Sequence, residues 1–220
     1  LFGLTENDSP YKTALEVCLA LNGHPKSPFY NRIKLYGNDY DGTFIPPLSQ
    51  STMIKRIVSF ISVSSKEAEN DRFRRRKELK GYSGTKKLPF REFYATDDDS
   101  SISDCLFYYF SSIQHYFSSL WKYDTKSKPT NVLQSTVGFE ALMKILKDIL
   151  SIDNNIKFGK NAFDKYVNKF ADLQLHDTNQ FPMTTRGKKI LYYSIFIKVF
   201  PDDASIEEKQ RELESLNNAE

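Results

Sequence analysis

The stretch ISDCLFYYFSSIQHYFSSLW, residues 102–121, decides the fold class. Its apolar side chains recur at steps of three and four residues, at Ile102, Leu106, Phe110, Ile113, Phe117 and Leu120. This spacing places them on one face of an α-helix. Three aspartates at 97–99, followed by Ser100, supply the negative charge and the capping group that favour a helix start.

Further aromatic residues make this helix apolar on more than one face. Tyr108, Tyr109, Tyr116 and Trp121 widen the apolar surface beyond a single stripe. A helix with so wide an apolar surface has to be covered. We therefore expect it to lie at the centre of the protein or under a partner chain.

Other segments carry start and stop signals for helices. The clearest is Ser9-Pro10, which predicts an N-cap and a first helical residue, with Asn22-Gly23 as the stop. The remaining predicted helices begin at Ser49 or Ser51, at Ser135-Thr136 and at Gly159 to Asn161, and the last runs from about Thr185 to Pro201.

One short segment has the alternation of a β-strand. Polar and apolar residues alternate from Arg32 to Tyr36, and Thr43 to Ile45 follow after a glycine-bounded loop. The sequence therefore predicts a mainly α, compact multi-helix domain with one small β-hairpin near residues 32–45. We expect a single helical domain over residues 1–201, with a basic insertion at 64–95, and an acidic polar tail at 202–220.

Composition limits the class of protein. The 220 residues are 40% hydrophobic and 14% aromatic, which is enough to bury a core. The apolar stretches end well before the roughly 18 residues of a membrane span, so no membrane association is expected. Cys18 and Cys105 lie in apolar helical patterns and predict buried free thiols in a reducing, cytoplasmic setting. Because the chain starts in the middle of an apolar pattern at Leu1, we expect it to be part of a longer protein.

Positive charge is concentrated in residues 66–91. Ten Lys or Arg residues face four acids there, a local net charge of +6, while the whole chain carries +3. Phe73, Tyr82 and Phe90 are interleaved, and cations with aromatics can neutralise phosphates and stack on bases. The candidate nucleic-acid-binding residues are Arg72, Arg74, Arg75, Arg76, Lys77, Lys80, Lys86 and Lys87. The alternative is a solvated helix face on which the acids pair with the bases.

Catalytic and cofactor motifs are missing from the sequence. It contains neither phosphate-binding glycine motif, GxxxxGK[ST] or GxGxxG, and no GxSxG. His24, His115 and His176 lack the spacing of a zinc site. No catalytic residue, metal or cofactor is predicted, and a site built from His24, Arg32 and distant acids is the remaining enzymatic hypothesis.

Four stretches resemble proteins with a DGQHR domain: LNGHP at 21–25, SPFYNRIKLYG at 27–37, PLSQ at 47–50 and STVGFEAL at 135–142. That family includes regulators and accessory factors of bacterial DNA phosphorothioate modification. The naming motif Asp-Gly-Gln-His-Arg does not occur here; in the family it lies in an amino-terminal, ParB-like part. The resemblance, which covers about half of the chain, implies the helical carboxy-terminal portion of such a protein.

Two functions follow as hypotheses. The first, implied by the resemblance and by the charge of residues 66–91, is a DNA-associated regulatory or accessory protein of a bacterial DNA modification or defence system. The second is a non-enzymatic helical protein–protein interaction module. In that case the aromatic helix at 102–121 would dock a partner or a second copy of the chain.

Overall fold

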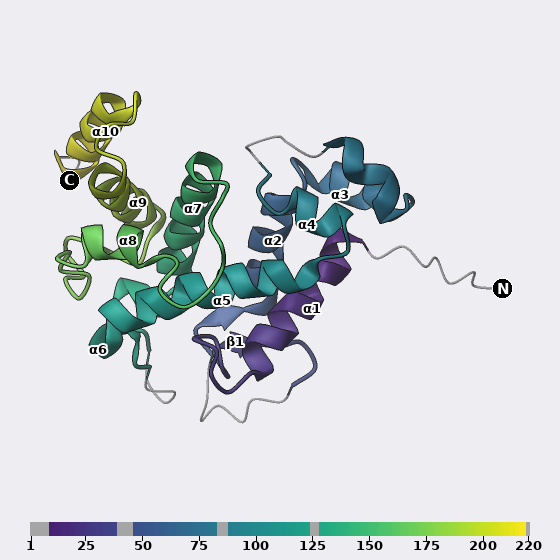
Figure 1. Cartoon of the computed structure of the whole chain (residues 1–220). Coiled ribbons are helices and arrows are strands. Elements are labelled where there is room, and N and C mark those ends of the chain that lie inside the picture. Colours follow the sequence, from purple (N-terminus) through teal and green to yellow (C-terminus); the bar gives the residue numbers. More distant parts are fainter. Residues whose placement is uncertain (1–8, 39–45, 83–87, 124–127, 219–220) are drawn as a thin grey trace.

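Helix α5 (Asp99–Tyr116) crosses the middle of the molecule (Figure 1). Asp98 caps it by accepting a hydrogen bond from the Ser101 backbone N–H at 3.2 Å, as the acidic start signal predicts. Ile102, Phe110 and Ile113 are fully buried. The predicted helix is present in two pieces, because the backbone leaves the helical conformation at Phe117 before the short α6 (Ser118–Trp121).

The structure is a computed structural model that describes residues 9–38, 46–82, 88–123 and 128–218; of residues 80–82 it describes the backbone only. The described residues form ten α-helices, three short 3₁₀ helices and two very short strands. The predicted mainly α, compact fold is thereby confirmed. Within the described ranges, no helix has both the length and the apolar character needed to cross a bilayer.

One group of helices lies toward the amino-terminal end of α5 (Figure 1). Its members are α1 (Pro10–Gly23), α2 (Gln50–Ile61), α3 (Ser65–Asp71), the 3₁₀ helix η1 (Arg76–Tyr82) and α4 (Arg91–Ala95). The predicted caps are confirmed: Ser9 accepts from the Lys12 N–H at 3.2 Å, and Ser49 accepts from the Thr52 N–H at 3.1 Å.

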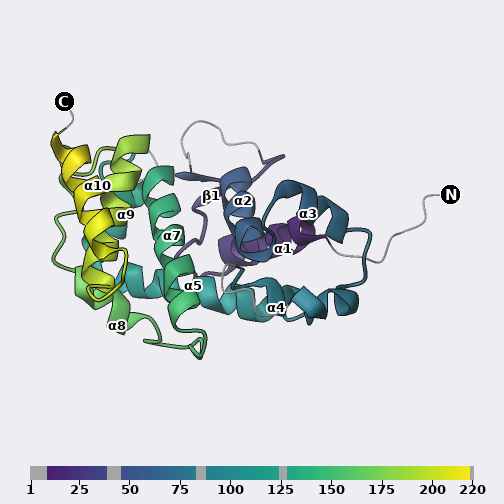
Figure 2. The ribbon, with the colours of Figure 1, turned by 90° about the horizontal axis from the view of Figure 1, so that it is seen from above.

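A second group lies toward the other end of α5. Its members are η2 (Val132–Gln134), α7 (Thr136–Ile152), α8 (Asp164–Val167), η3 (Asn168–Phe170), α9 (Thr185–Val199) and α10 (Ile206–Asn218). The helix predicted from Gly159 to Asn161 is limited to the short α8 and η3. The acidic segment after Pro201 contains α10, which runs beside α9 in Figures 1 and 2. Lys209 attaches it there, with its Nζ 3.9 Å from the centre of the Phe196 ring.

The β element differs from the predicted hairpin. Strand β1 (Ile33–Lys34) pairs in parallel with β2 (Leu48–Ser49), with Ile33 opposite Leu48. The described strand pair is therefore parallel and not the predicted hairpin, whose expected returning segment, residues 43–45, lies outside the described residues. Alternation shows which side chains face the core but not the direction of the partner strand. Ile33 and Leu48 are both buried, so the pair is held by the core.

Aromatic rings join the two groups of helices. Phe110 of α5 lies 4.6 Å from the Phe29 ring centre, 5.6 Å from Phe139 of α7 and 6.1 Å from Trp121 of α6. Edge and offset contacts of this kind add to the free energy of burial. These rings bring α6, α7 and the loop that precedes β1 to a single point on α5.

The close approach of η2 to α7 yields a stability prediction. A Cβ at Gly138 would collide with the backbone carbonyl of Val132, so the glycine permits this approach. We expect Gly138→Ala to lower the free energy of unfolding by about 1–3 kcal/mol, measured by urea denaturation. Gly23→Ala is the matched control, because nothing lies within 4 Å of its added Cβ. Equal stability of the two variants would contradict the described approach.

Candidate functional site

The basic segment is anchored by a buried ion pair between its ends. Arg91 on α4 donates to Asp71 at the end of α3, with Nη1 2.5 Å from Oδ2, and both side chains are 2% exposed. The guanidinium also donates to the Ile61 carbonyl at 3.3 Å. Breaking one half of such a pair leaves a buried charge without its partner. Arg91 and Asp71 therefore belong to the fold.

Arg76, predicted to contact nucleic acid, is buried as well. Its guanidinium donates to both carboxylate oxygens of Asp99, at 2.8 and 3.0 Å, and lies 4.6 Å from the centre of the Tyr94 ring. Burial alone would lower the pKa of Arg76, but the hydrogen bonds and charge of Asp99 raise it. With 7% exposure, Arg76 is not available to a phosphate. Its prediction as a nucleic-acid contact is corrected: it ties η1 to the start of α5.

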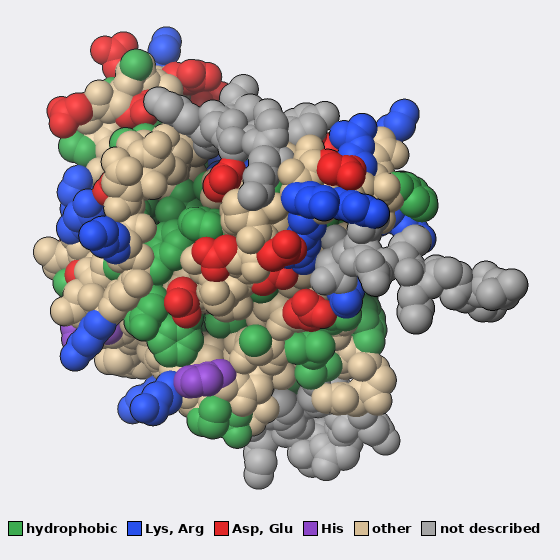
Figure 3. All heavy atoms as spheres, turned by 45° about the vertical axis from the view of Figure 1, so that its right-hand side comes forward, with side chains coloured by type: hydrophobic (Ala, Val, Ile, Leu, Met, Phe, Trp, Pro, Cys, Tyr) green, Lys and Arg blue, Asp and Glu red, His purple; other side chains and the backbone are tan. Residues whose placement is uncertain are grey.

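The exposed part of the basic segment lies on and after α3. Its described basic side chains are those of Lys66 on α3 and of Arg72, Arg74, Arg75 and Lys77 after it. Phe73 is 69% exposed, with the Arg72 guanidinium 4.9 Å from its ring centre, whereas Phe90 is buried. Figure 3 shows Lys and Arg side chains gathered over this corner, with acidic side chains nearby. The Lys80 side chain, Lys86 and Lys87 lie outside the described residues.

If the basic segment were only a solvated helix face, its acids would pair with its bases. Few such ion pairs are found in its described part. Asp71 is used by Arg91, and Glu67 accepts from the Val63 backbone N–H at 2.6 Å. Among the described residues, Arg72, Arg75 and Lys77 form no ion pair. Their charge is therefore exposed to solvent without a carboxylate partner.

A second positive region, which the sequence did not reveal, is a groove between α2, α7 and α9. It has a volume of about 420 Å³, within the range of roughly 300–1,000 Å³ typical of ligand sites. We call it the basic groove; its polar and aromatic lining consists of Arg56, Ser59, Phe60, Glu140, Lys144, Lys147, Lys188, Lys189, Tyr192 and Tyr193. Five cations face one carboxylate, so the lining has a net charge of +4.

Glu140 joins the three helices of the groove. Arg56 of α2 donates to its Oε1 through both Nε, at 3.1 Å, and Nη2, while Lys188 of α9 donates to its Oε2 at 2.8 Å. Burial alone would raise the pKa of Glu140, but the hydrogen bonds from Lys188 and Arg56 lower it. One carboxylate thus holds two cations and sets the spacing of the groove walls.

Two further lysines on α7 face the groove without an ion pair. Lys144 Nζ lies 3.6 Å from the centre of the Tyr192 ring, and Lys147 Nζ donates to the Ser59 carbonyl at 2.6 Å. Burial lowers the pKa of both amines. Tyr192 is oriented from behind, since its hydroxyl donates to Asp148 at 2.9 Å. An anion in the groove would offset the desolvation of these lysines.

The sequence hides this site because its cations come from three separate helices. Lys144 and Lys147 have the i, i+3 spacing of one helix face. Lys188 and Lys189 are the fourth and fifth residues of α9, close to the helix N-terminus, where the helix dipole disfavours positive charge. That unfavourable placement is the one signal in the sequence from which a binding role of these lysines could have been inferred.

The side chains of α5 that were predicted to dock a partner mainly contact other residues of the same chain. Phe107 and Tyr108 are half-buried; the Phe107 ring packs at 5.8 Å on the His24 ring and at 5.2 Å on Tyr108. None of the large apolar side chains found strongly exposed in the described ranges belongs to α5. Docking of a protein partner on α5 stays a prediction.

His24 and Arg32, on which the enzymatic hypothesis rests, do not form a common site. His24 accepts from the Lys26 backbone N–H through Nδ1 at 3.2 Å, while Arg32 donates to the Trp121 carbonyl at 2.7 Å, so the two take part in separate contacts. In the described part of the chain, no three His, Cys, Asp or Glu side chains are grouped to hold a metal ion. Cys18 and Cys105 are buried free thiols, as predicted.

Comparison with protein-family models, curated proteins and solved structures finds no match for this chain. Its chemistry is therefore inferred from its own residues.

The bridging role of Glu140 predicts a pH-dependent stability. We expect Glu140→Gln to lower the free energy of unfolding at neutral pH by about 1–3 kcal/mol, because two cations are left without their carboxylate. A carboxyl pKa lowered by folding gives stability that is present above the unfolded value, about 4.3, and lost as the pH falls through the folded value. Urea denaturation at several pH values should show the difference from wild type shrink below about pH 4.

Glu69→Gln is the control for this measurement. Glu69 is exposed on α3 and forms no ion pair among the described residues, so its replacement should change stability little. A deficit of Glu140→Gln that stays constant down to the lowest pH would contradict the bridging role.

Proposed function

We propose that this protein binds nucleic acid, with the basic groove as the main contact for the sugar–phosphate backbone. The observation that carries the proposal is the groove itself, where five cations line walls that contain a single carboxylate. Clustered Lys and Arg side chains are the electrostatic footprint of proteins that bind backbone phosphates. Tyr193, half-buried in the lining, offers a ring on which a base can stack.

The exposed basic corner at α3 supports an extended ligand. In both Figures 1 and 2, α9, α7, α2 and α3 follow one another across the molecule. A linear polyanion laid along this direction would meet the groove and then Arg72, Arg74 and Arg75. A small anion would need only the groove. The arrangement therefore favours a polymer.

The biological setting is part of the proposal. The resemblance to DGQHR-domain proteins supports DNA as the polymer and a regulatory or accessory role in a bacterial modification or defence system. Two buried thiols without a disulfide are compatible with the reducing cytoplasm in which such a system acts.

The salt dependence of binding tests the groove. We expect wild-type protein to bind a DNA duplex with an affinity that falls steeply with salt, measured by fluorescence anisotropy at several concentrations of NaCl. In Lys144→Gln/Lys189→Gln, the slope of log affinity against log salt should decrease by about 0.9 for each phosphate that the variant no longer neutralises. Neither lysine forms an ion pair among the described residues, so the fold should persist.

Lys55→Gln is the matched control, because Lys55 is exposed on the same helix as Arg56 but does not line the groove. It should retain the wild-type slope. Undetectable or salt-insensitive binding by the wild-type protein would refute nucleic-acid binding, and an equal decrease of the slope in Lys55→Gln would refute the groove as the binding surface.

The basic corner is tested separately. We expect Arg72→Ala/Arg75→Ala to weaken binding to a long duplex more than binding to a short one, because only the long duplex spans both regions. The same anisotropy titration with duplexes of two lengths measures this difference. Equal weakening for both lengths would refute the idea that only a long duplex reaches the corner from the groove.

A further inference from the structure

A second pocket lies between the loop before β1 and the end of α5 with α6. Its volume is about 420 Å³, and it is lined by Pro25, Ser27, Pro28, Tyr30, Asn31, Arg32, Gln114, Ser118, Trp121, Lys122 and Tyr123. This described lining contains two cations and no carboxylate. It shares no residue with the basic groove.

Arg32 is the central polar group of this pocket. One N–H of its Nη1 donates to the Trp121 carbonyl at 2.7 Å, and the guanidinium carbon lies 4.7 Å from the Trp121 ring centre and 5.6 Å from that of Tyr123. No carboxylate pairs with it among the described residues. Burial lowers the pKa of Arg32 to about 10, so the group is still charged at neutral pH. Its remaining N–H groups are available to a ligand.

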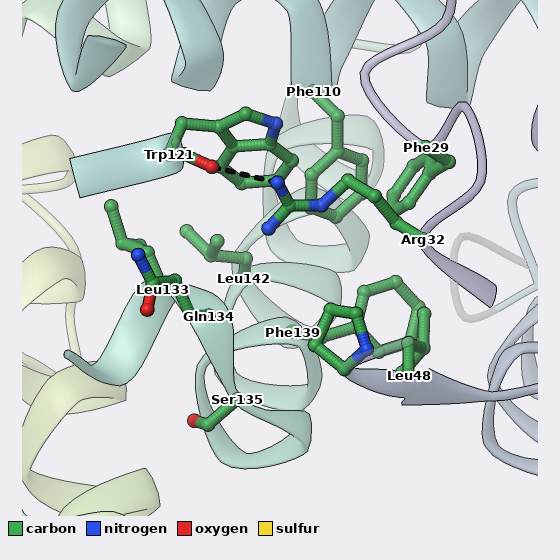
Figure 4. A pocket seen from close by; sticks show the side chains of 11 residues that line it. Phe29, Arg32, Leu48, Phe110, Trp121, Leu133, Gln134, Ser135, Phe139 and Leu142 are labelled. Atoms are coloured by element: carbon green, nitrogen blue, oxygen red, sulfur yellow. Dashed lines mark hydrogen bonds between the residues drawn. The ribbon is translucent and has the colours of Figure 1, made fainter. Parts of the chain in front are cut away.

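The surrounding contacts hold the guanidinium in place. Trp121 donates from Nε1 to the Pro28 carbonyl at 3.2 Å, so Trp121 and the loop at 28–32 exchange hydrogen bonds in both directions. Figure 4 shows the Arg32 side chain extended beside Trp121 above an apolar floor that includes Phe110, Phe139 and Leu142. The cavity at this floor has a volume of about 20 Å³, room for about one water molecule. Of the two cavities beside Arg32, the outer pocket is therefore the one with room for a ligand.

The lining is suited to a phosphate group rather than a carboxylate. Lys122 supplies a second cation, and Ser118 and Gln114 supply neutral donors at the exposed rim. Two cations with several donors match the charge and the three terminal oxygens of a phosphate monoester, whereas a carboxylate needs only the fork of one arginine. Tyr30, 45% exposed, and the partly buried Tyr123 provide faces for a planar ring.

We propose that this pocket binds the phosphate monoester of a small planar molecule, of the class of a nucleoside monophosphate, with Arg32 and Lys122 holding the phosphate and the tyrosines contacting the ring. The pocket is separate from the proposed nucleic-acid contact and does not depend on it.

Trp121 is the only tryptophan of the chain, so its fluorescence reports directly on this pocket. We expect AMP to change the fluorescence of the full chain saturably, with calorimetry giving the affinity, and adenosine, which lacks the phosphate, to bind at least about tenfold more weakly. Benzoate tests a carboxylate on a planar ring. Tighter binding of benzoate than of AMP would overturn the choice of phosphate, and equal binding of AMP and adenosine would overturn the role of the cations.

Arg32→Gln keeps a polar side chain but removes the charge and the Nη1 hydrogen bond to the Trp121 carbonyl, and should weaken AMP binding at least about tenfold. Lys122→Gln changes an exposed side chain and keeps the Arg32 contacts, so it tests the pocket even if Arg32→Gln fails to fold. Lys34→Gln, exposed on β1 outside the lining, is the matched control and should bind AMP normally.

The two sites are distinguished by measuring AMP binding to the variant of the basic groove as well. Lys144→Gln/Lys189→Gln should retain AMP binding and its fluorescence change. If that variant fails to bind AMP while Lys122→Gln still binds it, AMP occupies the basic groove and the proposal for this pocket is refuted. A wild-type protein that binds none of the three ligands refutes it as well.

Discussion

Phe110 has to be shielded from water on every side, and much of the architecture follows from how this is achieved. Its ring is fully buried near the middle of α5 and contacts rings that come from the loop before β1, from α6 and from α7. Because α5 is apolar on more than one face, neither group of helices alone can cover it. The two groups are therefore held on one helix, and burial of apolar area supplies most of the free energy that holds them.

Both candidate sites derive their geometry from this cluster. Phe139 and Leu142 turn one face of α7 toward α5, where the Leu142 carbonyl accepts from the Tyr109 hydroxyl at 3.0 Å. The opposite face, with Lys144 and Lys147, is left to form a wall of the basic groove. Phe29 and Trp121, which pack against the same Phe110 ring, position the loop that carries Arg32. The basic groove is lined by residues of three helices, which favours fixed geometry.

Local signals in the sequence predicted local structure well. Caps such as Ser9 and Ser135, and the spacing of apolar residues in α5, act within a few residues and are visible in one dimension. The direction of the strand pair and the burial of Arg76 depend on partners far along the chain. Arg76 reads as one basic residue in a basic run, and only the approach of Asp99 makes it structural. The groove was missed for the same reason, since its walls meet only in the folded chain.

The arginines and lysines of this protein fall into two kinds according to what compensates their burial. Arg91 and Arg76 are buried against Asp71 and Asp99, so their charges are matched within the fold. Lys144 and Arg32 are partly desolvated, with lowered pKa values, yet neither forms an ion pair among the described residues. The desolvation of such a cation costs stability, and no carboxylate bound to it within the described fold offsets that cost. A desolvated cation that forms no ion pair is explained if an anion from outside completes it, and both of these cations line pockets.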